Sequence, residues 1–263
     1  MKPVFLTLAM VGALVAPAFA LASGLQVMPT RLEVPAGKIA SITVKNSSES
    51  PINVQARALH WQQAAQGGHD IMREDAEDLI WYPKIFTVEP GGQQVVRVGS
   101  KTPSGDTERS YRLFIREVPV AIEGQPVTSF AIRMSIPVFI APADSSPAQP
   151  PDLLEIRPAA GQLVASVHNG GNRYFMMHPL EVHGISADPA MSFTRDARGW
   201  YVLPGATRQF DLGMTPGECM GLHSIRLVAR TRFGDTDREF DIDPAWCEKM
   251  SASVPAVAEI ANE

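Results

Sequence analysis

An alternating pattern of large apolar and smaller or polar residues occupies VTSFAIRMSIPVFIAP, residues 127–142. The large side chains stand at every second position: Phe130, Ile132, Met134, Ile136 and Val138. A period of two predicts a β-strand with these side chains on one face. Pro137 lies inside the run and cannot donate to a β-ladder, so the strand is expected at a sheet edge, a bulge or a strand end. Because an exposed apolar edge invites pairing with another chain, the pattern raises the question of what covers it.

Strand-like runs separated by turn residues dominate the rest of the chain. Before residue 127 they are GLQVMPTRLEVPAG, KIASITVKNSS, PINVQARALHW, DLIWYPKIFTVEPGG, QQVVRVGS and SYRLFIREVPV. A Pro/Ser/Ala-rich segment over 141–152 reads as a linker, and strand patterns resume after it. The short end AWCEKMSASVPAVAEIANE, residues 245–263, is the one segment with some helical period, but its Ala/Val/Ser character favours a frayed tail. The spacing predicts an all-β fold of two sandwich domains joined near residue 145.

The first residues, MKPVFLTLAMVGALVAPAFALASG, have the pattern of a secretory signal peptide. Lys2 precedes a short apolar run, and small-residue sites predict cleavage after Ala20 or Ala22. An uncleaved anchor is the alternative, although the run is short for a membrane span. We therefore expect residues 1–22 to be a signal peptide and the mature chain to lie outside the cytoplasm, without membrane insertion.

The charge of the chain limits the classes of molecule that it is expected to bind. The formal net charge is −5, from 23 basic and 28 acidic residues, and the Lys and Arg residues do not cluster. A nucleic-acid-binding face and a basic membrane-surface helix are therefore not expected.

The chain has two cysteines, Cys219 and Cys247. In an exported protein such a pair predicts a disulfide. It would close a loop of roughly 28 residues and contribute about 3 kcal/mol through loop entropy. A metal site that uses Cys219 and His223 is the weaker alternative, because no second ligand stands near Cys247.

Sequence motifs for catalysis are lacking: the chain has no G-x-S-x-G elbow, no H-E-x-x-H and no Walker loop. The segment HNGGN, residues 168–172, resembles a phosphate loop but lacks a following helix, so a turn is expected. No cofactor or metal is predicted. Four arginines within or beside strand patterns are either solvent-facing or fixed to hold a carboxylate bidentately: Arg31, Arg97, Arg112 and Arg116.

Four segments in this order, TRLEV, WYPKIFTVEPGGQQVVRV, RSYRLFIREVPV and the strand ending PVFIAP, resemble the periplasmic chaperones of the chaperone–usher pilus (fimbrial) assembly pathway. The resemblance covers residues 25–142 well. Residues 151–247 match more loosely, through NGGN and the LPG before a strand.

The resemblance implies two immunoglobulin-like β-sandwich domains in an L-shaped arrangement. Together with the linker and the strand patterns, this gives an N-terminal domain over 23–142, a linker over 143–152, a C-terminal domain over 153–248 and a tail over 249–263. It further implies a non-enzymatic periplasmic protein that binds pilin subunits by donor-strand complementation, a form of β-augmentation, and delivers them to an outer-membrane usher. Phe130, Ile132, Met134 and Ile136 would enter the subunit's open groove, while Val138 and Phe139 are expected to fill the chain's own core.

The family resemblance also implies an anchor for the subunit's C-terminal carboxylate, made by an Arg in the first strand and a Lys in the donor strand. Arg31 matches the Arg, but Pro137 stands where the Lys is expected, and Arg133 is the nearby basic candidate. Ala141 replaces an Arg that ties the two domains together in many relatives. These departures indicate a divergent branch of the family.

Two other classes of function compete with an assembly chaperone. One is a secreted β-sandwich carbohydrate-active enzyme, with Trp61, Trp81 and Trp200 as sugar platforms, although tryptophans beside strand patterns are more often core residues. The other is a structural pilus subunit, which is usually a single domain with an extended segment.

Overall fold

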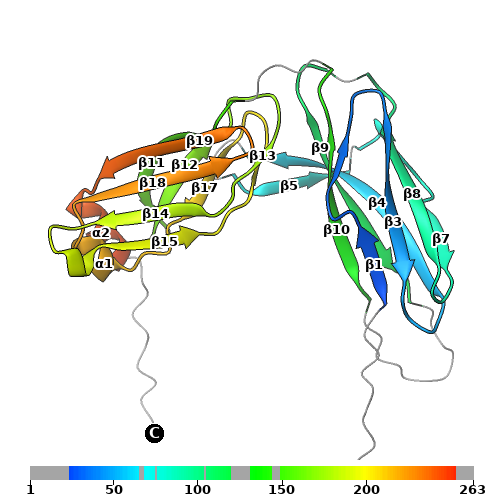
Figure 1. Ribbon diagram of the computed structural model, residues 1–263, viewed down its shortest axis with the longest axis horizontal. Coiled ribbons are helices and arrows are strands. Elements are labelled where there is room, and N and C mark those ends of the chain that lie inside the picture. The colour runs from blue at the N-terminus through cyan, green and yellow to red at the C-terminus, as the bar shows by residue number, and fades with distance from the viewer. Residues whose placement is uncertain are drawn as a thin grey trace, which may run out of the picture.

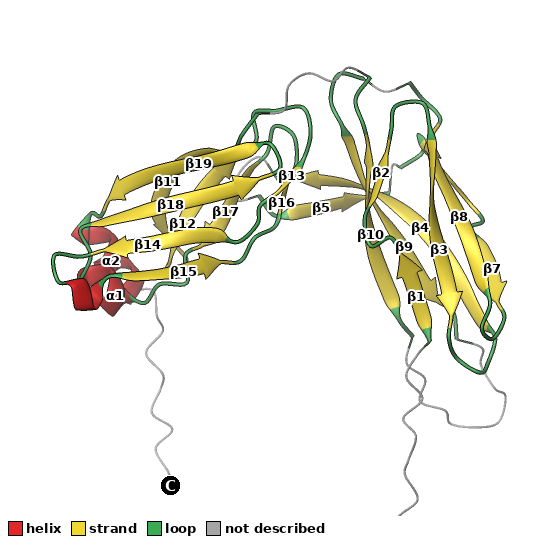
Figure 2. Cartoon of the chain, viewed as in Figure 1, coloured by secondary structure: helices red, strands yellow, loops and turns green. Residues whose placement is uncertain are grey.

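A computed structural model describes residues 24–64, 68–74, 76–103, 105–119, 131–143 and 149–252. The chain forms two β-sandwiches that meet at one end with their long axes at a steep angle, which gives the molecule an L shape (Figure 1). Strands make up nearly all of the regular structure, and the α-helices lie at the far end of the C-terminal sandwich (Figure 2). The predicted two-domain all-β fold is confirmed. The predicted signal peptide, residues 1–22, lies outside the described residues.

The N-terminal sandwich packs two sheets face to face. The first has the order β1 (Leu25–Met28), β3 (Ile39–Asn46), β8 (Gln93–Ser100) and β6 (Leu79–Tyr82). The second has the order β2 (Leu32–Val34), β10 (Arg133–Ile140), β9 (Arg109–Glu117), β4 (Ile52–Gln63) and β5 (Asp70–Arg73), with β7 (Ile85–Val88) also paired to β4. Alternation along each strand turns one set of β-branched and leucine side chains inward, and this set forms the N-terminal core.

The C-terminal sandwich is built in the same way. One sheet has the order β11 (Asp152–Ala159), β12 (Gln162–His168) and β17 (Thr207–Asp211), and the other β15 (Phe193–Ala197), β14 (Leu180–Ile185), β18 (Ser224–Thr231) and β19 (Gly234–Asp241). A two-stranded ribbon of β13 (Phe175–Met176) and β16 (Tyr201–Val202) lies at the end that meets the first domain (Figure 2). A 3₁₀ turn, η1 (Pro189–Met191), precedes β15.

Each domain has one buried asparagine at the corner that follows an inner strand. Asn46 Nδ2 donates to the carbonyl oxygens of Ser50 and Val88, at 2.8 and 2.9 Å. Asn169 Nδ2 donates to those of Arg173 and Val202, both at 2.9 Å. The side chains thus satisfy backbone groups that the turns leave unpaired. HNGGN is accordingly a turn, as expected.

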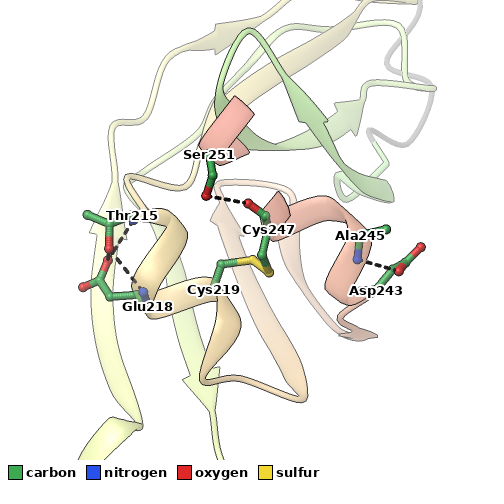
Figure 3. The surroundings of a disulfide bond; sticks show 7 residues. All are labelled: Thr215, Glu218, Cys219, Asp243, Ala245, Cys247 and Ser251. Carbon is green, nitrogen blue, oxygen red and sulfur yellow. Dashed lines mark hydrogen bonds between the residues drawn. A yellow bond between two sulfur atoms is a disulfide. The ribbon is translucent and has the colours of Figure 1, made fainter. Parts of the chain in front are cut away.

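Two short α-helices close the far end of the C-terminal domain, α1 (Pro216–Met220) and α2 (Pro244–Ala252). A disulfide between Cys219 and Cys247 joins them (Figure 3), as predicted, and excludes the alternative metal site. Thr215 and Glu218 form a capping box that starts α1. None of the helices within the described residues is long and apolar enough to cross a membrane.

The expectation of a frayed tail from Ala245, and of a tail that begins at residue 249, was wrong for residues 245–252. These residues belong to α2, and both Cys247 and Met250 are completely buried. The two positions are three residues apart and therefore lie on one helix face, which packs onto the domain. A helical pattern this short is a weak signal beside the Ala/Val/Ser composition of the segment, and the disulfide and this apolar face stabilise the helix.

Candidate functional site

Strand β10 is paired along its whole length on one side only. It pairs antiparallel with β9 from Arg133 to Ile140, whereas β2 pairs with it in parallel only over Val138–Ile140. Within the described part of the chain, no strand pairs with the β2-side edge of β10 over Arg133–Pro137. The first half of β10 is therefore a free sheet edge.

The position of Pro137 agrees with its placement at an edge. The backbone N–H of Glu117 on β9 donates to the carbonyl oxygen of Ile132 at 2.9 Å. Since partners alternate along an antiparallel pair, Ile132, Met134 and Ile136 direct their backbone groups toward β9, and the intervening residues direct theirs to the free edge. Pro137 thus costs no hydrogen bond to β9, and the free edge presents the backbone groups of Arg133 and Ser135.

The row of four side chains predicted to enter a subunit's groove is divided in the structure. Ile136 is only 4 % exposed and lies in the N-terminal core, because its pairing with Leu113 places it between the two sheets. The prediction that Ile136 is available to another chain was therefore wrong. Met134 is half-buried against the same core, Ile132 is half-buried, and Phe130 lies outside the described residues.

The second half of β10 contributes side chains to the cores of both domains. Val138 is buried in the N-terminal core. Phe139 points to the opposite face of the sheet, and it packs into the C-terminal core together with Trp61. The expectation that both fill the chain's own core is confirmed, and Phe139 does so across the domain boundary.

Arg31 lies between the two domains, at the mouth of a small pocket. The pocket has a volume of about 160 Å³ and is lined by Arg31, Tyr174, Met176, His178 and Arg232. Oε1 of Glu33 lies 3.5 Å from Arg31 Nε and 2.8 Å from Arg232 Nη1, and it also accepts a hydrogen bond from the Tyr174 hydroxyl. One carboxylate therefore holds groups from both domains.

The electrostatics of Glu33 follow from these contacts. Burial alone would raise its pKa, but the hydrogen bond from Tyr174 and the charges of Arg232 and Arg31 lower the pKa below its ordinary value. The carboxylate is therefore ionised at neutral pH and fixes the side chains of both arginines.

The structure does not bring Arg133 to Arg31. Leu32 lies beside Val138, so Arg31 lies beside Pro137, four residues from Arg133 along β10. At about 3.3 Å per residue the separation along the strand is roughly 13 Å. Arg133 instead lies over the ring of Phe114, with its guanidinium carbon 4.7 Å from the ring centroid.

Arg232 is the cation that the fold does bring to Arg31, and sequence reasoning missed it. It lies between β18 and β19 in the C-terminal domain, far from Arg31 along the chain. No local pattern connects the two residues, because only the packing of one domain on the other makes them neighbours.

The other arginines of interest have different roles. Arg97 is exposed, and Arg116 donates to the side chain of Gln55. Arg112, directly opposite Pro137, is 7 % exposed and lies over the ring of Trp61, with its guanidinium carbon 3.7 Å from the ring centroid. Burial lowers the pKa of Arg112, and its position is that of a cation–π contact at the domain interface.

Several polar contacts join the two domains, although Ala141 stands where the family resemblance leads us to expect an arginine between the domains. Besides the Glu33–Arg232 pair, a carboxyl oxygen of Glu108 accepts a hydrogen bond from the backbone N–H of Tyr174 at 2.8 Å. Asp70 accepts hydrogen bonds from Arg208 at 3.2 Å and from the Trp200 indole at 3.1 Å. These contacts join the two sandwiches although Ala141 has no charged side chain.

The three tryptophans do not form an open sugar platform. Trp61 is buried at the domain interface. The half-buried Trp81 donates its indole N–H to the carbonyl oxygen of Ala56, and the half-buried Trp200 donates to Asp70. All three rings are thus used for packing or internal hydrogen bonds.

Comparison of sequences identifies the family of the first domain. Residues 24–146 match the family described as pili and flagellar-assembly chaperone, PapD N-terminal domain. This range includes β10 and Arg31. Among curated proteins, no significant match was found.

Several solved structures share the two-domain fold. The CsuC–CsuE chaperone–tip adhesion subunit complex from archaic chaperone–usher Csu pili of Acinetobacter baumannii contains a chain with 19 % identity and a TM-score of 0.57, with 82 % of this chain and 97 % of that one covered. The CupB2 chaperone of Pseudomonas aeruginosa has 20 % identity and a TM-score of 0.51, and the match covers 83 % of this chain and 100 % of that one. The Salmonella enterica complex of the SafA pilin with the SafB chaperone contains a chain with 18 % identity and a TM-score of 0.54, and the match covers 84 % of this chain and 97 % of that one. At these identities the likeness establishes the fold.

Proposed function

We propose that this protein, a pilus assembly chaperone whose residues 24–146 belong to the pili and flagellar-assembly chaperone family, binds pilin subunits through the free edge of β10. The observation that carries the proposal is that, among the described residues, no strand pairs with the β2-side edge of β10 over Arg133–Pro137, whereas β10 is paired on both sides over Val138–Ile140. Unpaired backbone groups on such an edge are a template for a strand of another chain. Donor-strand complementation uses this template.

The side chains next to the edge supply the apolar contribution. Ile132 and Met134 are half-buried on the core-facing side of β10, and Phe130 continues the same alternation outside the described residues. Side chains on one face recur about every 6.6–7 Å, so three of them span roughly 13 Å of a groove. Full burial of an exposed side chain of this size contributes about 1.5–3 kcal/mol before the cost of ordering is subtracted, and the half-buried Ile132 and Met134 would each contribute part of this.

Arg31 is the proposed anchor for the subunit's C-terminal carboxylate. Its side chain is 42 % exposed and lines the pocket between the domains. A guanidinium group matches a carboxylate in geometry and charge. The anchor would fix the register of the subunit's strand against the edge of β10.

Compartment and partners are part of the proposal. The predicted signal peptide and the disulfide both agree with the periplasm, an oxidising compartment. The solved complexes of SafB with a pilin and of CsuC with a tip adhesion subunit support a pilin subunit as the partner. Delivery to an outer-membrane usher follows from the family resemblance and completes the proposed function.

The competing classes are less well supported. The family consists of chaperones and not enzymes, and the candidate sugar platforms are buried or internally bonded. A structural pilus subunit would not require a second sandwich, whereas this chain has two joined by an extensive interface.

The proposal is tested by co-expression of the chaperone with pilin subunits in the periplasm, followed by purification of the complex. Ile132→Asp places a charge beside the free edge and is expected to abolish capture of the subunit while the chaperone stays folded. Ile85→Asp is the matched control, since Ile85 is highly exposed on β7, away from this edge. Capture of pilin by Ile132→Asp at the wild-type yield would refute the role of the edge.

A further inference from the structure

The pocket beside Arg31 is built by both domains. Arg31 comes from the residues just before β2, whereas Tyr174, Met176, His178 and Arg232 come from the C-terminal domain. Its volume of about 160 Å³ is enough for a carboxylate group and the atoms next to it. Any anion in the pocket would therefore contact both sandwiches at once.

Two guanidinium groups face this pocket with one internal carboxylate between them. Arg31 and Arg232 share Oε1 of Glu33, and their side chains remain 42 % and 37 % exposed. Besides Glu33, Arg232 Nη2 donates to the carbonyl oxygen of Tyr174 at 3.3 Å, and its guanidinium carbon lies 4.5 Å and 4.7 Å from the ring centroids of Tyr174 and Phe233. Since each guanidinium carries five N–H donors, both groups keep donors for an acceptor from outside.

Two other arginines near Arg31, Arg112 and Arg133, do not supply the second cation at this place. Arg112 is stacked on Trp61 and almost completely buried. Arg133 lies roughly 13 Å along β10 from the residue beside Arg31. Pro137, which lies next to Arg31, carries no charge.

From this geometry we propose that Arg232 is the second cation of the subunit anchor, so that a subunit's C-terminal carboxylate is bound by guanidinium groups of both domains. The inference rests on the proposed function and assigns the role that Pro137 cannot fill. Glu33 holds the two guanidinium groups in place while the pocket is free of a subunit. Capture of a subunit thereby depends on the relative position of the domains as well as on the edge of β10.

The test uses the full-length mature chaperone and a synthetic peptide with the sequence of the last strand of a captured pilin. The peptide is prepared as the free acid and as the carboxamide, and its affinity is measured by fluorescence anisotropy. Wild-type chaperone is expected to prefer the acid by about tenfold or more. Arg31→Gln and Arg232→Gln should each remove most of this preference.

Two further variants separate binding of the carboxylate from maintenance of the domain interface. Arg226→Gln is the matched control, because Arg226 is also an ion-paired arginine of the C-terminal domain, paired with Asp237 and outside the pocket. It should keep the full preference. Glu33→Gln breaks the Glu33–Arg232 ion pair across the interface but keeps both cations, and it should also keep the preference for the acid.

The outcomes distinguish the inference from the proposed function. If Arg232→Gln retains the wild-type preference, or if Glu33→Gln loses the preference as completely as Arg232→Gln, Arg232 is not the second cation. If the wild type binds acid and amide equally, the anchor is absent although the edge of β10 is still used. If the chaperone captures no pilin and binds neither peptide, the proposed function itself fails.

Discussion

The rings of Phe139 and Tyr174 stack across the domain boundary with their centroids 3.5 Å apart and their planes 13° from parallel. Phe139 comes from the second half of β10, the half that β2 covers. The same strand therefore presents a free edge at its beginning and joins the two domains at its end. Tyr174 continues the connection through its hydroxyl to Glu33, beside Arg31.

Phe139→Ala should destabilise the protein by about 3–5 kcal/mol, because it removes a buried ring from the core that spans the interface. Urea unfolding followed by tryptophan fluorescence would measure the loss. Phe114→Ala, on the same face of the sheet but half-buried, is the control and should cost clearly less. Equal losses would contradict a special role of the stack.

Ile136→Ala should cost about 2–5 kcal/mol of stability, as is usual for a buried isoleucine. Ile132→Ala, at the half-buried start of the same row, should cost much less and should weaken subunit capture instead. Denaturant unfolding and the yield of the chaperone–pilin complex test the two halves of this prediction. A larger loss of stability for Ile132 would mean that the row belongs to the core throughout.

Replacement of both Cys219 and Cys247 by serine should lower stability by about 2–5 kcal/mol, since the disulfide joins α1 to α2. Thiol titration of the unfolded, unreduced wild type should detect no free thiol among its two cysteines. Detection of two thiols would show that the bond does not form in the cell.

Stability should fall as the pH rises from about 5 to 8, in part because of Glu108. This side chain is only 8 % exposed, and burial raises its pKa to about 8. Between its ordinary value of 4.5 and about 8, the folded protein retains a proton that the unfolded chain releases, so a higher pH favours unfolding. Glu108→Gln should flatten this dependence, measured as urea unfolding at pH 5 and pH 8. An unchanged slope would exclude Glu108 as a source of the effect.

Export should remove residues 1–20 or 1–22, since cleavage is predicted after Ala20 or Ala22. Intact-mass spectrometry of the protein recovered from the periplasm reads the cleavage site directly. Mature protein that still carries Met1 would contradict the signal peptide and support an uncleaved anchor.

The sequence by itself determined the strand pattern, the edge position of β10 and the disulfide. Alternation of side chains is a local property of a strand, so VTSFAIRMSIPVFIAP was recognisable without knowledge of its neighbours. Because Pro137 lacks a backbone donor, it limited that part of the strand to a sheet edge, a bulge or a strand end. The order of the four resembling segments also indicated the family.

Only the tertiary structure decided which residues of those elements are buried in the core and which side chains lie next to one another. Ile132 and Ile136 follow the same alternation, but Ile132 is half-buried whereas Ile136 lies in the N-terminal core. The difference depends on how far the opposing sheet and β9 extend along the strand. The sequence offered Arg133 as the nearby cation and gave no sign of Arg232, but strand register moves Arg133 away from Arg31 and domain packing brings Arg232 close. Burial, register and contacts between domains depend on segments distant in the chain, and a local pattern carries no information about them.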